Sequence, residues 1–81
     1  MTLYEFRMLS EVEQLNTIWR VGKCIDNTVE NGYGINLYAI DMFFIEVVYD
    51  AKADTIIENR PFKEGHRLDK YSKGLNEYFS L

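Results

Sequence analysis

The residue types that perform nucleophilic or acid–base chemistry are scarce in this sequence. It contains one histidine, His66, and one cysteine, Cys24. Histidine titrates near neutral pH, but catalysis also needs partner groups around it, and neither a serine nor the cysteine stands beside His66 in the sequence. One cysteine and one histidine cannot complete a structural zinc site. We therefore expect an exposed His66 at a helix entry, a small buried Cys24, no catalytic residue, and neither metal nor cofactor.

Glu46 is the carboxylate that sits within the most apolar run of the chain, residues 43–49. It could act as a general acid if its surroundings paired it with Asp26 or Glu58 across a sheet. Side chains of a strand alternate between two faces, however, so we expect Glu46 to point to solvent. The acidic segment 50–54 resembles a calcium loop only faintly, because a lysine occupies a ligand position and the glycine is absent. We expect a solvated hairpin there.

Two helices are predicted at the start of the chain. Residues 2–5 and 10–13 both match the capping box, in which a hydroxyl and a glutamate satisfy the first free backbone N–H groups of a helix. They predict helices over about 3–9 and 11–21, the second ending at Gly22 with a positive φ. The stripe of the second helix that should face the core is Val12, Leu15, Ile18 and Trp19.

The next forty residues change to a strand pattern. Asn31-Gly32 is the strongest short hairpin signal, since both central residues of a type I′ turn need φ > 0. A two-residue loop there places Val29 opposite Gly34 and Ile25 opposite Tyr38. Pro61 cannot donate to a ladder and belongs at the end of an edge strand. The predicted strands are residues 24–30, 35–40, 43–49 and 55–60, with turns at 41–42 and 50–54.

Strand alternation assigns each side chain to one of two sheet faces. The core face should hold Tyr38, Ile40, Phe43, Ile45, Val47 and Tyr49, and the mixed, exposed face should hold Asp26, Thr28, Phe44 and Glu46. A last helix is predicted over about 67–79, with Leu68, Tyr71, Leu75, Tyr78 and Phe79 on one side. The fold class is α+β: a four-stranded antiparallel meander with two N-terminal helices and one C-terminal helix packed on one face. Trp19, Ile45, Val47, Tyr71 and Leu75 should be mutually buried.

Size and composition limit the classes of protein that fit. The chain has 81 residues, which is one domain spanning 1–81, and 47% of them are hydrophobic, which excludes disorder. No apolar run approaches a membrane span, and the opening residues do not have the pattern of a signal peptide. A lone cysteine forms no internal disulfide. We expect a cytoplasmic protein with no membrane partner and no deep substrate cavity.

Charge is distributed unevenly along the chain. The net charge is −4, but residues 24–58 carry seven acids against Lys52 alone, whereas residues 60–73 carry five bases against two acids. Either the acidic middle or the basic segment 60–73 could steer a partner. Tyr33 at the hairpin tip and Phe44 on the mixed face are candidate anchors of such a contact. The charged candidates are the basic residues Arg60, Lys63, Arg67, Lys70 and Lys73 and the acidic residues Asp50, Asp54 and Glu58.

Residues 37–40 and 43–50, followed by Ile56 and Phe62, resemble a group of short uncharacterised bacterial proteins, as does the opening 2–6. This resemblance implies a stand-alone domain and carries no activity. In size and charge alone the chain is similar to phage- or mobile-element-encoded inhibitors of bacterial defence nucleases, anti-CRISPR proteins among them. We expect a non-enzymatic protein that binds a larger protein or ribonucleoprotein stoichiometrically. The alternative is a nucleic-acid-binding or regulatory module that uses the basic segment 60–73, so direct nucleic-acid contact is the less favoured expectation.

Overall fold

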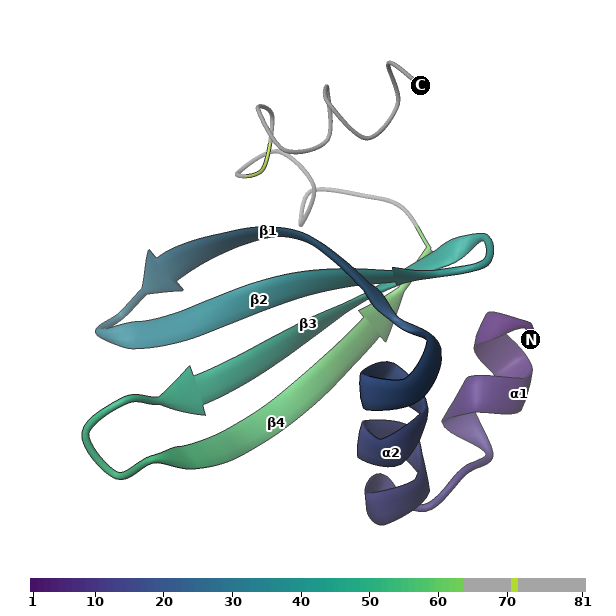
Figure 1. Ribbon diagram of the computed structural model, residues 1–81, viewed down its shortest axis with the longest axis horizontal. Helices are drawn as coiled ribbons and strands as arrows, with labels where there is room; N and C mark the ends of the chain where they lie inside the picture. Colours follow the sequence, from purple (N-terminus) through teal and green to yellow (C-terminus); the bar gives the residue numbers. More distant parts are fainter. Residues whose placement is uncertain (64–70, 72–81) are drawn as a thin grey trace.

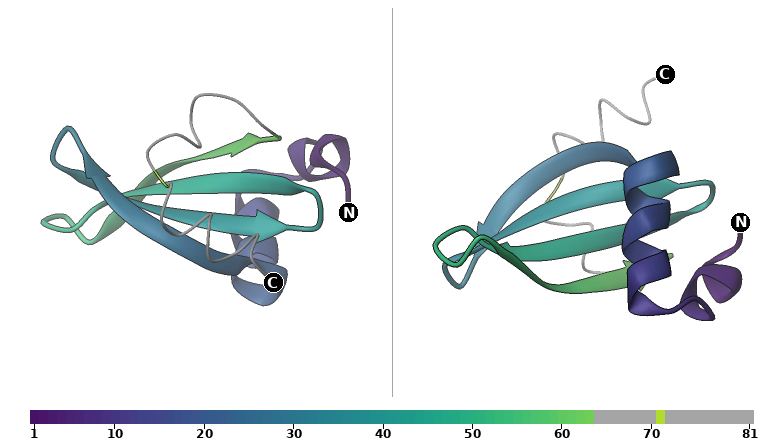
Figure 2. Two further views of the ribbon diagram at one scale, coloured as in Figure 1. Left: turned by 90° about the horizontal axis from the view of Figure 1, so that it is seen from above. Right: turned by 60° about the horizontal axis from the view of Figure 1, so that its bottom comes forward.

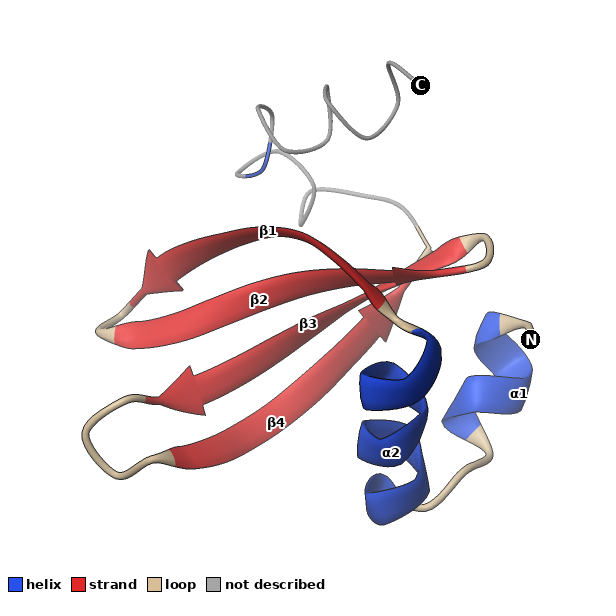
Figure 3. Cartoon of the chain, viewed as in Figure 1, coloured by secondary structure: helices blue, strands red, loops and turns tan. Residues whose placement is uncertain are grey.

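A computed structural model describes residues 1–63 and Tyr71 of the chain. Two helices precede a four-stranded sheet, and the helical and strand segments are separate along the chain, as Figure 3 shows. The predicted α+β class with a four-stranded antiparallel sheet is confirmed. The elements are α1 (Leu3–Arg7), α2 (Glu11–Val21), β1 (Lys23–Glu30), β2 (Tyr33–Ile40), β3 (Phe43–Asp50) and β4 (Thr55–Phe62).

Both capping boxes form as predicted and begin the two helices. The Thr2 side chain accepts from the Glu5 N–H, and the Ser10 side chain accepts from the Glu13 N–H. The returned hydrogen bonds, from the Thr2 and Ser10 backbone N–H groups, hold the pKa of each glutamate below its usual range. Gly22 differs from prediction, because its φ is −74°. A Cβ at this position would lie 2.6 Å from the Ile18 carbonyl oxygen, so glycine is needed there for close approach.

The sheet is an antiparallel meander with strand order β1-β2-β3-β4 (Figure 1). The predicted hairpin at Asn31-Gly32 is confirmed, with φ of 54° and 82° at its two central residues. The turn between β2 and β3 is also two residues long, since Ile40 pairs with Phe43. Pro61 lies opposite Ile45 near the end of the edge strand β4, the kind of position where a sheet tolerates a residue without an N–H.

One register prediction is right and one is wrong. Val29 pairs with Gly34 as expected, but Cys24, and not Ile25, pairs with Tyr38. A bulge between Cys24 and Asp26 inserts one residue and shifts the pairing beyond it. A bulge would appear in the sequence as a break in a regular alternation of apolar and polar residues. This segment alternates too loosely for such a break to be recognised.

The two helices cover the predicted core face at one end of the sheet, and the β1–β2 and β3–β4 turns extend away from them (Figure 2). Phe6 and Phe43 meet with ring centroids 5.5 Å apart, and Asn59 of β4 donates to the Gln14 side chain of α2 at 3.1 Å. Trp19 and Val12, placed in the core stripe by periodicity, are exposed instead. The buried members of this cluster are Phe6, Ile18, Ile40, Phe43, Ile45 and Val47.

The opposite sheet face is buried too, and the expectation of an exposed face is wrong. Phe44 stacks on Phe62 at 5.7 Å between ring centroids, and Tyr71 belongs to this cluster rather than to the one under the helices. Trp19, Ile45, Val47 and Tyr71 are therefore not one core. The buried members of the second cluster are Ile35, Leu37, Ala39, Phe44, Val48, Phe62 and Tyr71.

The predicted helix over 67–79, Leu75 included, lies outside the described residues apart from Tyr71. His66 lies outside them as well. Over the part of the chain that is described, neither helix has the length and apolar character needed to cross a lipid bilayer.

Candidate partner-binding groove

The helix-bearing face of the sheet has a part that the helices do not reach. Strand pairing places four residues in one row across it, namely Val29 opposite Gly34, Gly34 opposite Tyr49, and Tyr49 opposite Ile56. This open row shares a face with Val47 and Ile45, two and four residues before Tyr49 on β3, yet Val29 is 73% exposed and Ile56 40%. An apolar row that no described segment covers is a candidate contact surface.

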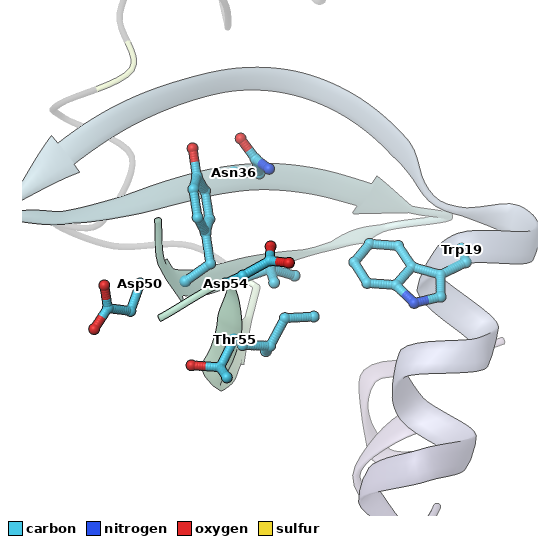
Figure 4. Close-up of a pocket in the computed structure, with 8 residues that line it drawn as sticks. Trp19, Asn36, Asp50, Asp54 and Thr55 are labelled. Atoms are coloured by element: carbon cyan, nitrogen blue, oxygen red, sulfur yellow. The ribbon is translucent and has the colours of Figure 1, made fainter. Parts of the chain in front are cut away.

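Two members of the open row, Tyr49 and Ile56, line a hollow beside α2, which we call the groove (Figure 4). Its volume is about 320 Å³, at the lower end of the range for small-ligand pockets. The indole ring of Trp19 extends from α2 toward the sheet on one side, and the β3–β4 turn forms the other. The lining residues are Trp19, Asn36, Val47, Tyr49, Asp50, Asp54, Thr55 and Ile56.

Trp19 is held by one aromatic contact that leaves much of its ring free. Its ring meets that of Tyr38 edge-on, with centroids 5.7 Å apart and planes at 69°. The indole is nevertheless 52% exposed. Burial raises the pKa of the Tyr38 hydroxyl, against the smaller effect of a hydrogen bond from Asn36. Tyr38 is thus a neutral, fixed support that presents Trp19 to solvent at the edge of the groove.

Gly34 sets the position of the second aromatic ring in the groove. A Cβ on this glycine would lie 2.2 Å from Cζ of Tyr49, so the hydroxyl end of the tyrosine ring lies directly over the backbone of Gly34. Any side chain at position 34 would push the ring away from the sheet. The absence of a side chain on one strand therefore creates the aromatic floor on the next.

The turn that closes the groove carries two carboxylates with different roles. Asp50 Oδ1 accepts from the backbone N–H groups of Lys52 and Ala53 at 3.0 and 3.2 Å, so it shapes the turn. Asp54 has a φ of 53°, a left-handed conformation that aspartate tolerates. Among the described residues Asp54 makes no hydrogen bond or ion pair, and it is exposed. Its charge is available to a ligand.

Glu46 lies on the opposite face and does not point to solvent as expected. Its side chain is 0% exposed. The Tyr71 hydroxyl donates to Glu46 Oε2 at 2.5 Å, and Arg60 Nε lies 3.4 Å from Oε1. Burial and the adjacent carboxylate raise the pKa of the Tyr71 hydroxyl well above its usual range. Because Glu46 has no exposed surface, it cannot reach a substrate in this conformation. The contacts of Glu46 with Tyr71 and Arg60 are part of the packing on this face of the sheet.

The predicted charged surfaces are divided in the structure. Arg60 is surrounded by carboxylates, with Glu30 and Glu58 each 3.8 Å away in addition to Glu46. Glu58 thus belongs with Arg60 and not with the two aspartates of the groove. Lys63 is exposed at the end of β4, beside Phe43. The other basic candidates, Arg67, Lys70 and Lys73, lie outside the described residues.

The two predicted aromatic anchors differ in exposure. Tyr33 is 41% exposed beside the hairpin, where a partner can reach it, but Phe44 is buried against Phe62 and offers no anchor in this conformation. Sequence reasoning missed Trp19 and Ile56 as surface residues. The available signal was the strand register, which places Tyr49 and Ile56 one row beyond the row of Asn59, the residue that α2 contacts.

Cys24 is exposed at the start of β1, contrary to the expectation of a buried side chain. Desolvation raises the pKa of its thiol, which lowers the fraction of reactive thiolate. Within residues 1–63 and Tyr71, no three histidine, cysteine or acidic side chains gather at a metal-binding distance.

Comparisons of the chain with protein-family models, with curated proteins and with solved structures give no match.

Proposed function

We propose that this protein acts in the cytoplasm by stoichiometric, non-catalytic binding to a larger protein or ribonucleoprotein, and that this partner is a bacterial defence nuclease that it inhibits. The observation that carries the proposal is the groove, where Trp19, Tyr49 and Ile56 stay accessible in a small chain that buries both faces of its sheet elsewhere. Aromatic residues with nearby polar groups are typical anchors of protein interfaces.

The choice of a defence nuclease as partner is supported by the size and acidity of the chain, which has 81 residues and a net charge of −4. Inhibitors of this kind act by occupying a surface on the nuclease, and the binding surface described above needs no cofactor to do so. The proposed site on this protein is the groove together with the adjacent row residue Val29.

A titration tests the proposal directly. The purified full-length protein is added in increasing amounts to each of several RNA-guided DNA-cleaving nucleases, and DNA cleavage is measured. A stoichiometric inhibitor lowers cleavage linearly until it stops at a fixed molar ratio. Inactivation that continues with time at far lower ratios would show turnover and overturn the non-catalytic proposal, while full cleavage at large excess with every nuclease would overturn the choice of partner.

Two variants of α2 link inhibition to the groove. Trp19→Ala removes the aromatic wall, and Val12→Ala removes an apolar side chain that is also exposed on the same helix, 69% against 52%. We expect inhibition to weaken with the first variant and to stay unchanged with the second. Equal inhibition by both would place the contact elsewhere on the molecule.

A binding assay with a short DNA or RNA tests the alternative of nucleic-acid binding. Phosphate contacts release counterions, so binding to DNA or RNA weakens steeply as salt increases. In the structure Arg60, the first base of the 60–73 segment, already faces three carboxylates, which disfavours a phosphate at that position. We expect no retention of a short DNA or RNA at physiological salt.

A further inference from the structure

We infer that the groove takes an arginine side chain of the partner, flanked by apolar residues, an inference that rests on the function proposed above and names the chemistry its site recognises. The relevant features are a carboxylate without a partner among the described residues (Asp54), two aromatic residues (Trp19 and Tyr49) and one exposed apolar residue (Ile56), all of which line one hollow.

The charge of the groove selects a cation. Two of its eight lining residues, Asp50 and Asp54, are acidic, and none is basic. Asp50 is engaged with the backbone of the turn, whereas Asp54 has no hydrogen-bond or ion-pair partner among the described residues. Figure 4 shows the Asp54 carboxylate on the side of the groove that faces Trp19. A cation in the hollow would be attracted by this carboxylate, and it could also contact the face of the half-exposed indole.

The two aromatic rings favour arginine over lysine. The Trp19 indole is half exposed, the tip of the Tyr49 ring lies over Gly34, and both residues line the hollow. A guanidinium is planar and weakly hydrated, and it stacks on aromatic rings while it donates to a carboxylate, whereas an ammonium does only the latter well. Beside this position, Ile56 and Val29 remain exposed for the residues that flank the arginine in the partner.

The same carboxylates exclude a phosphate ligand from the groove. A nucleic acid placed here would bring its negative backbone against Asp54 and Asp50 with no base among the lining residues to offset the repulsion. The occupant is therefore a segment of protein, and an oligonucleotide serves as the contrasting probe.

The test is an NMR titration of the full-length, nitrogen-15-labelled protein with the peptide acetyl-Leu-Arg-Leu-amide. Trp19 is the single tryptophan of the chain, so one indole N–H signal reports the groove without ambiguity. We expect saturable shifts of that signal and of the backbone signals of Tyr49, Asp54 and Ile56. The matched peptide carries citrulline in place of arginine, which keeps the shape and removes the charge.

Two variants, each with a matched control, measure how much the Asp54 carboxylate and the Trp19 ring contribute to peptide binding. Asp54→Asn should weaken binding roughly threefold, while Asp41→Asn, at a turn aspartate with nearly the same φ (50° against 53°), should leave it unchanged. Trp19→Ala should weaken it roughly tenfold, with Val12→Ala as its control. Should Trp19→Ala fail to fold, the Asp54→Asn pair still decides the question.

Three results would overturn the inference: equal affinity for the arginine and citrulline peptides, shifts centred away from the groove, or no saturable shift. A short single-stranded DNA that shifts the Trp19 indole signal would overturn it as well. Nuclease inhibition is measured without any peptide, so the two proposals fail separately. Inhibition without peptide binding rejects the arginine site alone, and peptide binding without inhibition rejects the nuclease partner alone.

Discussion

On the helix-bearing face of the sheet, the core cluster is apolar, and the buried polar residue of α2, Thr17, is uncharged and donates to the Glu13 carbonyl oxygen within the helix. On the opposite face, an apolar cluster of similar extent encloses the carboxylate of Glu46, which is satisfied by Tyr71 and faces Arg60. The first kind of core depends on volume and shape and tolerates small rearrangements. The second depends on specific partners, because a buried charge that loses its counterion is costly. The difference shows that burial alone does not describe how this sheet is held together.

Removing apolar volume should have the largest effect and should be felt on both faces. Ile45 under the helices and Leu37 on the opposite face are each 0% exposed. Ile45→Ala and Leu37→Ala should each lower the free energy of unfolding by about 2–5 kcal/mol, measured by urea denaturation. A loss under about half a kcal/mol for Leu37→Ala would show that the opposite face is open, as alternation alone indicated.

Breaking the contact between Glu46 and Arg60 should show that the face opposite the helices depends on a specific pair of charges. Arg60→Leu removes the Arg60 cation from beside the buried Glu46 carboxylate and should cost about 3 kcal/mol. The double variant Glu46→Leu with Arg60→Leu should recover most of this loss, because replacing both charges by apolar groups is often neutral. If the double variant is as unstable as the single one, packing and not charge is the cause.

Removing one hydroxyl tests the link from the sheet to Tyr71. Tyr71→Phe loses the hydrogen bond to the Glu46 carboxylate and should cost about 2 kcal/mol near neutral pH. The Tyr71 pKa is higher in the folded protein than its ordinary value of about 10 in the unfolded chain. Its contribution is therefore complete below pH ~10 and is lost as the pH rises above that value.

Urea denaturation at several alkaline pH values measures this loss. The wild type should lose stability more steeply than Tyr71→Phe, and the two should converge. The control is Tyr33→Phe, at an exposed tyrosine, which should follow the wild type at every pH. A constant difference between wild type and Tyr71→Phe across the alkaline range would contradict the assigned contact.

Weakening the start of α2 should have the smallest effect and should concern the helix-bearing face alone. Ser10→Ala removes the acceptor for the Glu13 N–H and should cost about 1 kcal/mol. Asn16→Ala, at an exposed position in the middle of the same helix, should change stability little. An equal effect of the two substitutions would mean that the cap does not hold the helix.

Much of the local structure is predictable from the sequence because its causes are local. The hydroxyl and glutamate of each capping box lie three residues apart, and Asn31-Gly32 supplies two residues that adopt positive φ easily. The apolar floor of the groove was half predictable, since alternation placed Tyr49 on the helix-bearing face. Its exposure was not, because it depends on how α2 packs across the sheet, where Gln14 accepts a hydrogen bond from Asn59.

The sequence by itself determined the helix starts, the hairpin turns, the strand faces and the pairing of Val29 with Gly34, because each follows from neighbours in the chain and from the two-residue period of a strand. The tertiary structure alone decided which faces are covered. Glu46 is buried and accepts from Tyr71, 25 residues away, whereas Trp19 is exposed although its helix contacts the sheet through Gln14 and Asn59. Coverage depends on contacts between distant segments, and periodicity within one segment carries no information about them.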